Sequence, residues 1–258
     1  MAQIHPTAVV DPRAEIDGSV GIGPYAVIGP DVRIGAGTTI GAHCVIDGRT
    51  RIGCDNRIFP FNSIGAMPQD MSHRGEPTEL HIGDRNTIRE FCTFSRGTAQ
   101  DAGVTRVGND NWVMAYVHVA HDCQVGNDVI MSNNATLAGH VHVEDHVILS
   151  GFCAVHQFCR IGAHSFIGGL CGITRDVLPF LMVAGVPPEP RGINQEGLKR
   201  RGFGPEQLRN LKEAYRILYR SGLRLVEARE QLAALAASQP EVRAIVEFLD
   251  RSERSIVR

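Results

Sequence analysis

The sequence IGPYAVIGPDVRIGAGTTIGAHCVI, residues 22–46, decides the fold. An isoleucine occupies every sixth position of this stretch, and glycine follows most of these isoleucines. A six-residue period matches neither the 3.6-residue period of an α-helix nor the two-residue alternation of a simple strand. The pattern indicates short strands separated by tight corners, where Gly, Asn or Asp can adopt unusual backbone angles.

The same period continues on both sides of this stretch. It runs from Ile4 to Ile64, keeps its phase to Phe94 across an interruption, shifts by one residue, and resumes from Val107 to Ile173. Three such units close one coil of 18 residues, and successive coils pair as parallel strands about 4.8 Å apart. We therefore expect a mainly β fold, a parallel β-solenoid of triangular cross-section, over residues 1–190.

Two segments break the period and must leave the solenoid, residues 66–80 and 95–106. Both are polar and contain glycine. Loops that leave a rigid scaffold are common places for binding residues, although a tolerated insertion is an equally simple interpretation.

The pattern changes after Pro190 to one that is typical of helices. Apolar residues recur at helical spacing from Leu208 to Tyr219 and again from Val242 to Leu249, with turn signals between them. We expect a C-terminal helical domain over residues 191–258 that covers the last coil and protects its edge from pairing with other strands.

Composition excludes several classes of protein. The net charge of −2 argues against a nucleic-acid partner, and no apolar stretch approaches the roughly 20 residues of a membrane span. Seven cysteines without a CxxC spacing, in a chain with no apparent secretory leader, predict reduced thiols and a cytoplasmic location. Residues 191–258 hold 14 Lys and Arg against 9 Asp and Glu, a net charge of +5. This basic region could attract an acidic partner or be an ordinary solvated surface.

Histidine is the residue type most suggestive of chemistry. Because residues 18 apart stack, four histidines and two neighbours fall along one edge of successive coils: His118, His121, Gly139, His140, His156 and Gln157. Such a cluster predicts a functional site, with a solvated or interface histidine ladder as the alternative. His142, His146 and His164 fall at other positions of the period, where we expect ordinary surface residues.

Two chemistries use clustered imidazole groups. A neutral histidine can act as general base while backbone N–H groups stabilise an oxyanion. Alternatively, three histidines can hold zinc and leave one position open for hydroxide. The spacing alone does not separate these possibilities.

Longer motifs make the sequence similar to one family. They are AHDCQVGN (120–127), NNATLAGHV (133–141), AVHQFCRIGAHS (154–165), NQEGLKRRGF (194–203), GEPT (75–78), IGDRNTIRE (82–90) and RGT (96–98). Through these motifs the chain resembles the UDP-N-acetylglucosamine acyltransferases, which begin lipid A synthesis, over essentially its whole length. The resemblance implies a left-handed β-helix, although the general rule for parallel crossovers favours the opposite hand.

The resemblance implies three catalytic residues. His121 would remove the proton from the 3-hydroxyl of the glucosamine ring, so that the oxygen attacks the thioester of a 3-hydroxyacyl chain. Asp122 would support the imidazole, although alternation of side chains along a strand would direct the two residues apart. Gly139 would present its backbone N–H to the oxyanion.

The resemblance also implies how the substrates bind. Gly169 would lie at the floor of the acyl-chain pocket, where a glycine leaves room for a longer chain. The positions implied around the sugar and diphosphate are Asp70, His118, His140, His156 and Gln157. Those near the nucleotide are Asn194 and Glu196, and a basic pair near phosphate and the carrier protein is Arg200 and Arg201.

The sequence also departs from the family. Ser72 stands where relatives often carry lysine, which could move a contact to Arg74. Ser95 stands where histidine is frequent, and Leu170 and Pro187 differ from common choices.

Partners follow from the same resemblance. The acyl donor would be acyl carrier protein, an acidic helical protein that suits the basic C-terminal region, and the acceptor would be UDP-N-acetylglucosamine. The family is a homotrimer with sites between neighbouring solenoids. No cofactor and no metal are expected.

Three other functions remain open. Another hexapeptide acyltransferase, such as the N-acyltransferase of the same pathway, has an extra N-terminal domain, for which a repeat that starts at Ile4 leaves no room. A γ-type carbonic anhydrase binds zinc through three histidines between subunits of the same fold. The third is a non-catalytic solenoid that serves as a structural or binding surface, in which the histidines have no catalytic role.

Overall fold

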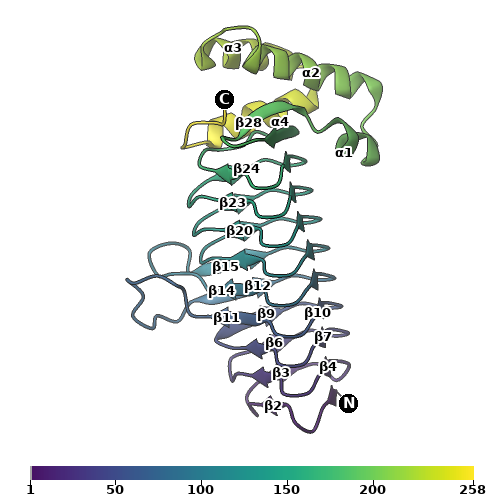
Figure 1. The fold of residues 1–258 in the computed structure, drawn as a ribbon, viewed down its shortest axis with the longest axis vertical. Coiled ribbons are helices and arrows are strands. Elements are labelled where there is room, and N and C mark those ends of the chain that lie inside the picture. Colours follow the sequence, from purple (N-terminus) through teal and green to yellow (C-terminus); the bar gives the residue numbers. More distant parts are fainter. Residues whose placement is uncertain (1) are drawn as a thin grey trace.

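Each coil of the protein consists of three short strands separated by corners, and the stacked coils form a triangular prism with helices at one end (Figure 1). The computed structural model describes residues 2–258. Equivalent strands of successive coils pair in parallel and in register, so that Ile4 pairs with Ile22 and Ile22 with Ile40. The six-residue period thus becomes three walls, as predicted from the sequence.

The first sheet forms one wall of the prism and ends in an antiparallel pair of strands. Its strands are, in order, β1 (Gln3–Ile4), β4 (Gly21–Ile22), β7 (Thr39–Ile40), β10 (Arg57–Ile58), β13 (Thr87–Ile88), β16 (Trp112–Val113), β19 (Ile130–Met131), β22 (Ile148–Leu149), β25 (Phe166–Ile167), β27 (Leu181–Ala184) and β28 (Glu189–Ile193).

The second and third sheets form the other two walls. The second contains β2 (Val9–Val10), β5 (Val27–Ile28), β8 (Val45–Ile46), β11 (Ser63–Ala66), β14 (Thr93–Ser95), β17 (His118–Val119), β20 (Thr136–Leu137), β23 (Ala154–Val155) and β26 (Gly172–Ile173). The third contains β3 (Glu15–Ile16), β6 (Arg33–Ile34), β9 (Arg49–Ile52), β12 (Glu79–Ile82), β15 (Val104–Val107), β18 (Gln124–Val125), β21 (His142–Val143) and β24 (Arg160–Ile161).

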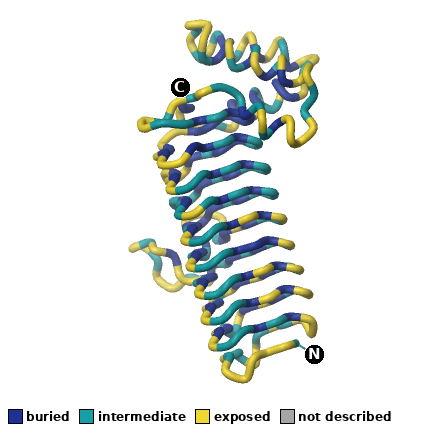
Figure 2. Tube along the Cα trace, turned by 45° about the vertical axis from the view of Figure 1, so that its right-hand side comes forward, coloured by how far each residue is buried: buried dark blue, intermediate teal, exposed yellow. Residues whose placement is uncertain are grey.

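The core is the column of repeated aliphatic side chains inside the prism. Ile46, Ile64 and Leu137 have no exposed surface. The first coil is different, because no other coil of residues 2–258 packs on its N-terminal side: Ile4 is 42% exposed, and Val10 is only partly buried. Figure 2 shows this gradient, with exposed chain at the N-terminal end and buried chain inside the later coils.

The corners are built from residues in the left-handed backbone region, most of which are not glycine. At the corner between the first and second sheets, five consecutive coils place an aromatic ring at this position. The rings stack with centroids 5.0–5.1 Å apart, which is one coil spacing. We call this set the aromatic ladder; its members are Tyr25, His43, Phe61, Phe91 and Tyr116.

Two loops leave the prism on the same side (Figure 1). The first loop, residues 67–78, joins β11 to β12, and the second loop, residues 96–103, joins β14 to β15. Both loops are shorter than predicted, because the last residues of each expected segment belong to a strand of the third sheet. These strands are β12 and β15, which pair with each other. The loops touch: Gln100 Nε2 donates a hydrogen bond to Ser72 Oγ at 3.1 Å.

The C-terminal region is helical and lies over the last coil (Figure 1). It comprises α1 (Gln195–Arg200), α2 (Pro205–Tyr219), α3 (Leu225–Ala236) and α4 (Pro240–Arg251). The apolar side chains of α2 and α4 are buried, including Leu211 and Phe248. Strand β28 crosses the predicted limit at residue 190. No helix within residues 2–258 is both long and apolar enough to cross a membrane.

Candidate active site

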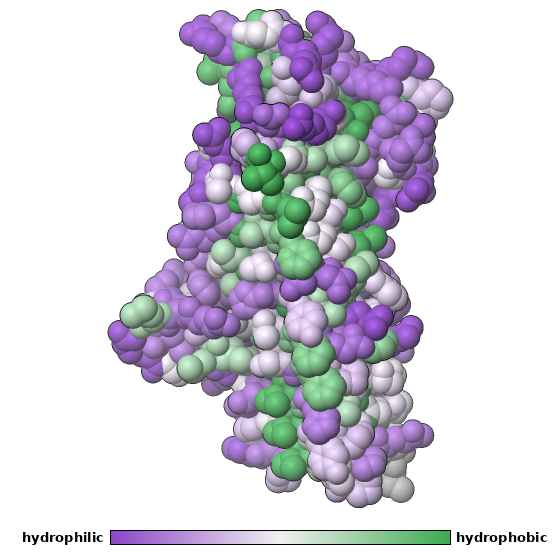
Figure 3. All heavy atoms as spheres, in the orientation of Figure 1, coloured by the Kyte–Doolittle hydropathy of each residue, from purple (hydrophilic) through white to green (hydrophobic). Residues whose placement is uncertain are grey.

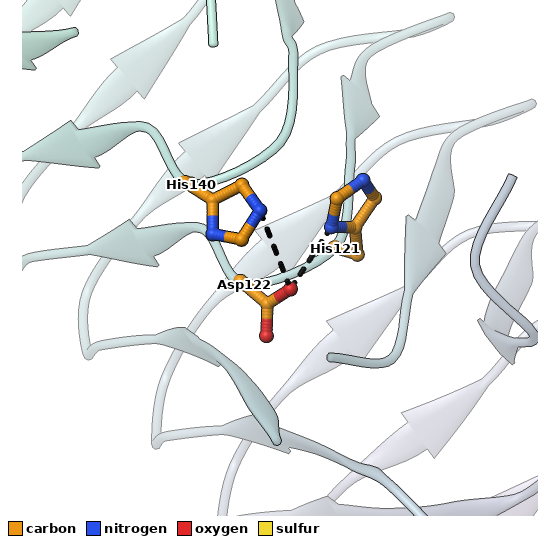
Figure 4. Close-up of side chains that lie close together, drawn as sticks. All are labelled: His121, Asp122 and His140. Carbon is orange, nitrogen blue, oxygen red and sulfur yellow. Dashed lines mark hydrogen bonds and ion pairs between the residues drawn. The ribbon is translucent and has the colours of Figure 1, made fainter. Parts of the chain in front are cut away.

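Three side chains meet at the corner between the second and third sheets (Figure 4). His121 and Asp122 occupy this corner between β17 and β18, and His140 occupies it one coil further on, between β20 and β21. The Nδ1 atom of His121 lies 2.9 Å from Oδ2 of Asp122, and the two imidazole rings meet edge to face at 5.0 Å. The constant coil length therefore brings together histidines that are 19 positions apart.

Asp122 reaches His121 because it is a corner residue rather than a strand residue. Its φ of 59° places it in the left-handed region, where the alternation of side chains along a strand no longer applies. The divergence of the two side chains expected from alternation therefore does not occur.

Asp122 is 1% exposed, and both oxygens of its carboxylate accept hydrogen bonds. The backbone N–H of Thr98 donates to Oδ1 at 2.9 Å and to Oδ2 at 3.1 Å, and the Thr98 hydroxyl donates to Oδ2 at 2.6 Å. A carboxylate only accepts hydrogen bonds, so the proton of a neutral His121 ring lies on Nδ1. The unprotonated Nε2 is then left as the basic atom of the ring.

Gly139 lies against this imidazole, one coil above His121. A Cβ atom at position 139 would lie 2.5 Å from Cε1 of His121, so any side chain would displace the ring. The neighbouring N–H groups, of Ala138 and His140, are bonded to Val155 and His121. In the described chain the N–H of Gly139 has no hydrogen-bond partner and is available to a developing negative charge.

His118, on β17, stands three residues before His121. Its Nδ1 atom lies 2.7 Å from the hydroxyl oxygen of Thr93. Burial lowers the pKa of His118, and the neighbouring His121 lowers it further. His118 is therefore uncharged at neutral pH and offers a hydrogen bond rather than a charge.

His140 is held from two sides. Its Nδ1 atom lies 2.7 Å from Oδ2 of Asp101 in the second loop, and its ring stacks on Phe158 at 4.4 Å. The hydrogen bond to His140 is the main cause that lowers the pKa of Asp101. Neither Asp101 nor Thr98 was predicted as a site residue from the sequence: both lie in an aperiodic segment predicted to form a loop, and Thr98 also ends the RGT motif (96–98), to which no role was assigned.

Asp70 belongs to the first loop. It accepts hydrogen bonds from the backbone N–H and the hydroxyl of Ser72. These bonds lower the pKa of Asp70, with smaller contributions from His121 and His73. Arg74 donates to the carbonyl groups of Met71 and His73 in its own loop, and the transfer of the lysine contact to Arg74 stays a prediction.

His156 and Gln157 lie at the same corner one coil above His140, and both are exposed. The Nδ1 atom of His156 lies 3.1 Å from the carbonyl oxygen of Gln157. Within residues 2–258, no hydrogen bond or ion pair joins either residue to His121, Asp122 or His140.

The remaining predicted residues lie nearer the C-terminal end. Asn194 caps α1 by accepting from Gly197 N–H, and it donates to the carbonyl of His164. Glu196 pairs with Lys199 at 2.9 Å, while the pair of arginines at positions 200 and 201 is exposed. A Cβ atom at Gly169 would lie 3.2 Å from the carbonyl oxygen of Gly151, so the surroundings of Gly169 are already tight. None of these residues forms a hydrogen bond or ion pair with His121, Asp122 or His140 in the part of the chain that is described.

The site could also be considered as a metal centre. One ligand atom each from His121, Asp122 and His140 lie within 4.8 Å of one another, and two imidazoles with a carboxylate are a possible zinc set. However, Asp122 already accepts hydrogen bonds from Thr98 and His121, and Asp101 accepts from His140. This arrangement favours acid–base chemistry.

Comparisons with known proteins cover the whole chain. Family models described as "Udp N-acetylglucosamine O-acyltransferase; Domain 2" and "Bacterial transferase hexapeptide (six repeats)" match residues 176–257, and residues 13–48 and 105–139, respectively. The acyl-[acyl-carrier-protein]–UDP-N-acetylglucosamine O-acyltransferases of Janthinobacterium sp. (strain Marseille) and Burkholderia lata are 58% and 56% identical, over 100% of both chains. The UDP-N-acetylglucosamine acyltransferase structure from Francisella novicida superimposes with a TM-score of 0.97 at 45% identity, over 99% of this chain and 94% of that chain. This agreement confirms the left-handed parallel β-helix with C-terminal helices.

Proposed function

The chain belongs to the family of acyl-[acyl-carrier-protein]–UDP-N-acetylglucosamine O-acyltransferases, and from this premise we propose how its residues carry out the first step of lipid A biosynthesis. The reaction transfers a 3-hydroxyacyl chain from acyl carrier protein to the 3-hydroxyl of UDP-N-acetylglucosamine. The observation that carries the proposal is the His121–Asp122 pair, packed against Gly139, whose N–H has no hydrogen-bond partner in the described chain.

In this mechanism Nε2 of His121 takes the proton of the sugar hydroxyl as the hydroxyl oxygen attacks the thioester carbonyl. Asp122 stabilises the imidazolium that forms, and the N–H of Gly139 donates to the oxyanion. The carbon–sulfur bond then breaks and His121 returns the proton to the leaving thiolate. A positioned general base contributes about 10²–10⁴-fold, and one oxyanion donor about 10²–10³-fold.

Substrate binding uses the surrounding residues. The sugar and diphosphate contact Asp70 and the histidines of the same edge, and Asn194 and Glu196 face the nucleotide. Arg200 and Arg201 suit phosphate, because each guanidinium can donate two parallel hydrogen bonds. His118, His140, His156 and Gln157 complete the sugar and diphosphate set, and Gly169 ends the acyl pocket.

The assembly is a homotrimer with a site between each pair of neighbouring prisms. Support comes from the surface: Val9, Val27 and Val45 on the second sheet are 63%, 41% and 45% exposed, next to the exposed aromatic ladder. Figure 3 shows apolar side chains running along the prism on this face. A long exposed apolar strip of this kind usually marks a protein interface.

The carrier protein docks on the basic C-terminal region, whose net charge of +5 complements an acidic partner. The location is the cytoplasm, where seven unpaired thiols stay reduced.

A single assay tests the reaction. The purified protein is incubated with UDP-N-acetylglucosamine and a panel of 3-hydroxyacyl carrier-protein thioesters, and products are identified by mass. We expect one O-acylated product, a preferred chain length, and loss of about 10³-fold or more in kcat for His121→Ala. His5→Ala, at an exposed position of the first coil that is outside the aromatic ladder, is the matched control and should retain activity. Near-normal turnover by His121→Ala would contradict the mechanism.

The second candidate function, zinc-dependent hydration of carbon dioxide, is favoured only by the proximity of His121, Asp122 and His140. Elemental analysis of protein purified without chelator decides between the two. Stoichiometric zinc with carbon dioxide hydration, and no acylated sugar nucleotide, would support the hydratase.

A further inference from the structure

The carboxylate of Asp122 lies between two imidazole rings. Its Oδ2 atom is 2.9 Å from Nδ1 of His121 and 3.9 Å from Nε2 of His140. Both rings are partly covered, with 17% and 15% of their side-chain surface exposed. A modest rotation of the carboxylate would exchange one partner for the other. Other residues must therefore determine whether Asp122 accepts a hydrogen bond from His121 or from His140.

The second loop passes directly over this carboxylate. A Cβ atom at Gly97 would lie 2.7 Å from Oδ1 of Asp122 and 2.3 Å from the backbone nitrogen of Val104. The next residue, Thr98, is 1% exposed and gives Asp122 both its backbone N–H and its hydroxyl. Two donors from one residue fix the plane of the carboxylate as well as its position.

The same loop acts on His140 from the other side. Asp101 accepts from Nδ1 of His140 at 2.7 Å. Because a carboxylate can only accept, the proton of a neutral His140 lies on Nδ1, and Nε2 has none to offer Asp122. The 3.9 Å separation of Nε2 from Oδ2 agrees with this, since it exceeds hydrogen-bond length.

We propose that the second loop is the positioning element of the site: Thr98 fixes Asp122 against His121, and Asp101 prevents His140 from competing for it. Thr98 and Asp101 are positioning residues that act through Asp122 and His140. The consequence for catalysis rests on the proposed function, because a carboxylate shared between the two rings would leave His121 partly in the tautomer whose Nε2 cannot accept a proton.

The first test compares variants of one buried threonine. Thr98→Val removes the hydroxyl donor but keeps shape and backbone bonds, and we expect kcat to fall about tenfold, as for loss of a hydrogen bond to a charged group. Thr98→Ser should restore kcat to within about twofold. The matched control is Thr78→Val, because Thr78 is also buried but its hydroxyl has no partner in the described chain. Wild-type kcat in Thr98→Val, or equal losses in Thr98→Val and Thr98→Ser, would overturn the proposal.

A double-mutant cycle tests the second part of the proposal, that Asp101 prevents His140 from competing with His121 for Asp122. Asp101→Ala alone should lower kcat less than about threefold, because the Thr98 hydroxyl still holds Asp122. In the Thr98→Val background the same change should cost more, since His140 can then compete. Additive effects would contradict the shared role.

Nuclear magnetic resonance of protein with ¹⁵N-labelled histidine rings gives a readout that needs no turnover. His121 should show a single Nδ1–H tautomer in the wild type and both tautomers in Thr98→Val. If Thr98→Val does not fold, Asp101→Ala decides, since Nε2–H should then appear on His140. An unchanged spectrum overturns the positioning role, whereas the expected spectra without any acylated product would refute only the proposed reaction.

Discussion

The regular coils up to residue 58 and the coils around and after the two loops have the same backbone arrangement of three strands. They differ in the side chains at the corner between the second and third sheets. In the regular coils, the corner between the second and third sheets presents residues such as Pro30 and Asp31. In the later coils the same corner presents Asp122 and His140, and the second loop covers it. The difference shows that the repeat supplies the frame and brings the catalytic corner residues together, while the loops that break the repeat supply the residues that hold them in place. Stability and activity should therefore respond to different substitutions.

The largest expected effect is on stability in the regular coils. Ile46 is completely buried, so Ile46→Ala should lower the free energy of unfolding by about 2–5 kcal/mol. Ile4→Ala, at the exposed first coil, should cost less than about 1 kcal/mol. Urea unfolding measures both, and kcat of the folded protein should not change. Equal losses at the two positions would break the comparison between buried and terminal coils.

The next largest expected effect is on kcat, at the corner that the second loop covers. Gly139→Ala should push the His121 ring away and lower kcat about 10–100-fold, since general-base catalysis requires an aligned ring. Gly18→Ala, in the first coils, is the control, because no atom lies within 4 Å of the Cβ that it would add. Steady-state kinetics with matched unfolding curves separates the two effects. A Gly139→Ala enzyme with normal kcat would show that the ring tolerates displacement.

The smallest expected effect is on the pH dependence of stability, and it concerns His164 near the last coil. His164 packs against His146 and Phe180, and burial lowers the pKa of His164 to about 4 from 6.5. Between these values the unfolded chain binds a proton that the folded chain does not, so stability should fall as pH drops from about 6.5 toward 4 and stay constant above about 6.5. Thermal unfolding across this range should show a weaker dependence for His164→Phe. The same dependence in both proteins would assign the effect to other groups.

Much of the fold could be predicted because it depends on one period. The six-residue spacing placed Ile22, Ile46 and Leu137 correctly inside the prism. It overestimated the burial of Ile4, because a repeat does not reveal that the first coil lacks a neighbour on one side. It also treated His164 as an ordinary surface residue, whereas the C-terminal helices and the aromatic contacts of the last coil bury much of it.

The site could be predicted only where it follows the coils. Coil length brought His121, Gly139 and His140 together, because 18 residues return the chain to the same edge. The contact between His121 and Asp122 depends on a left-handed corner, which alternation does not describe. Thr98 and Asp101 lie in a loop without a period, so no spacing could place them on the site.

The constant number of residues in each regular coil also makes the length of the prism adjustable. Excision of residues 23–40 would join Ile22 to Gly41 and recreate the same isoleucine–glycine junction with every later residue in register. The protein would become shorter by one step of about 4.8 Å, with the loops and the corner at His121 unchanged. The fold therefore behaves as a modular spacer, in which the distance from the N-terminal edge to the catalytic edge can be set in whole coils.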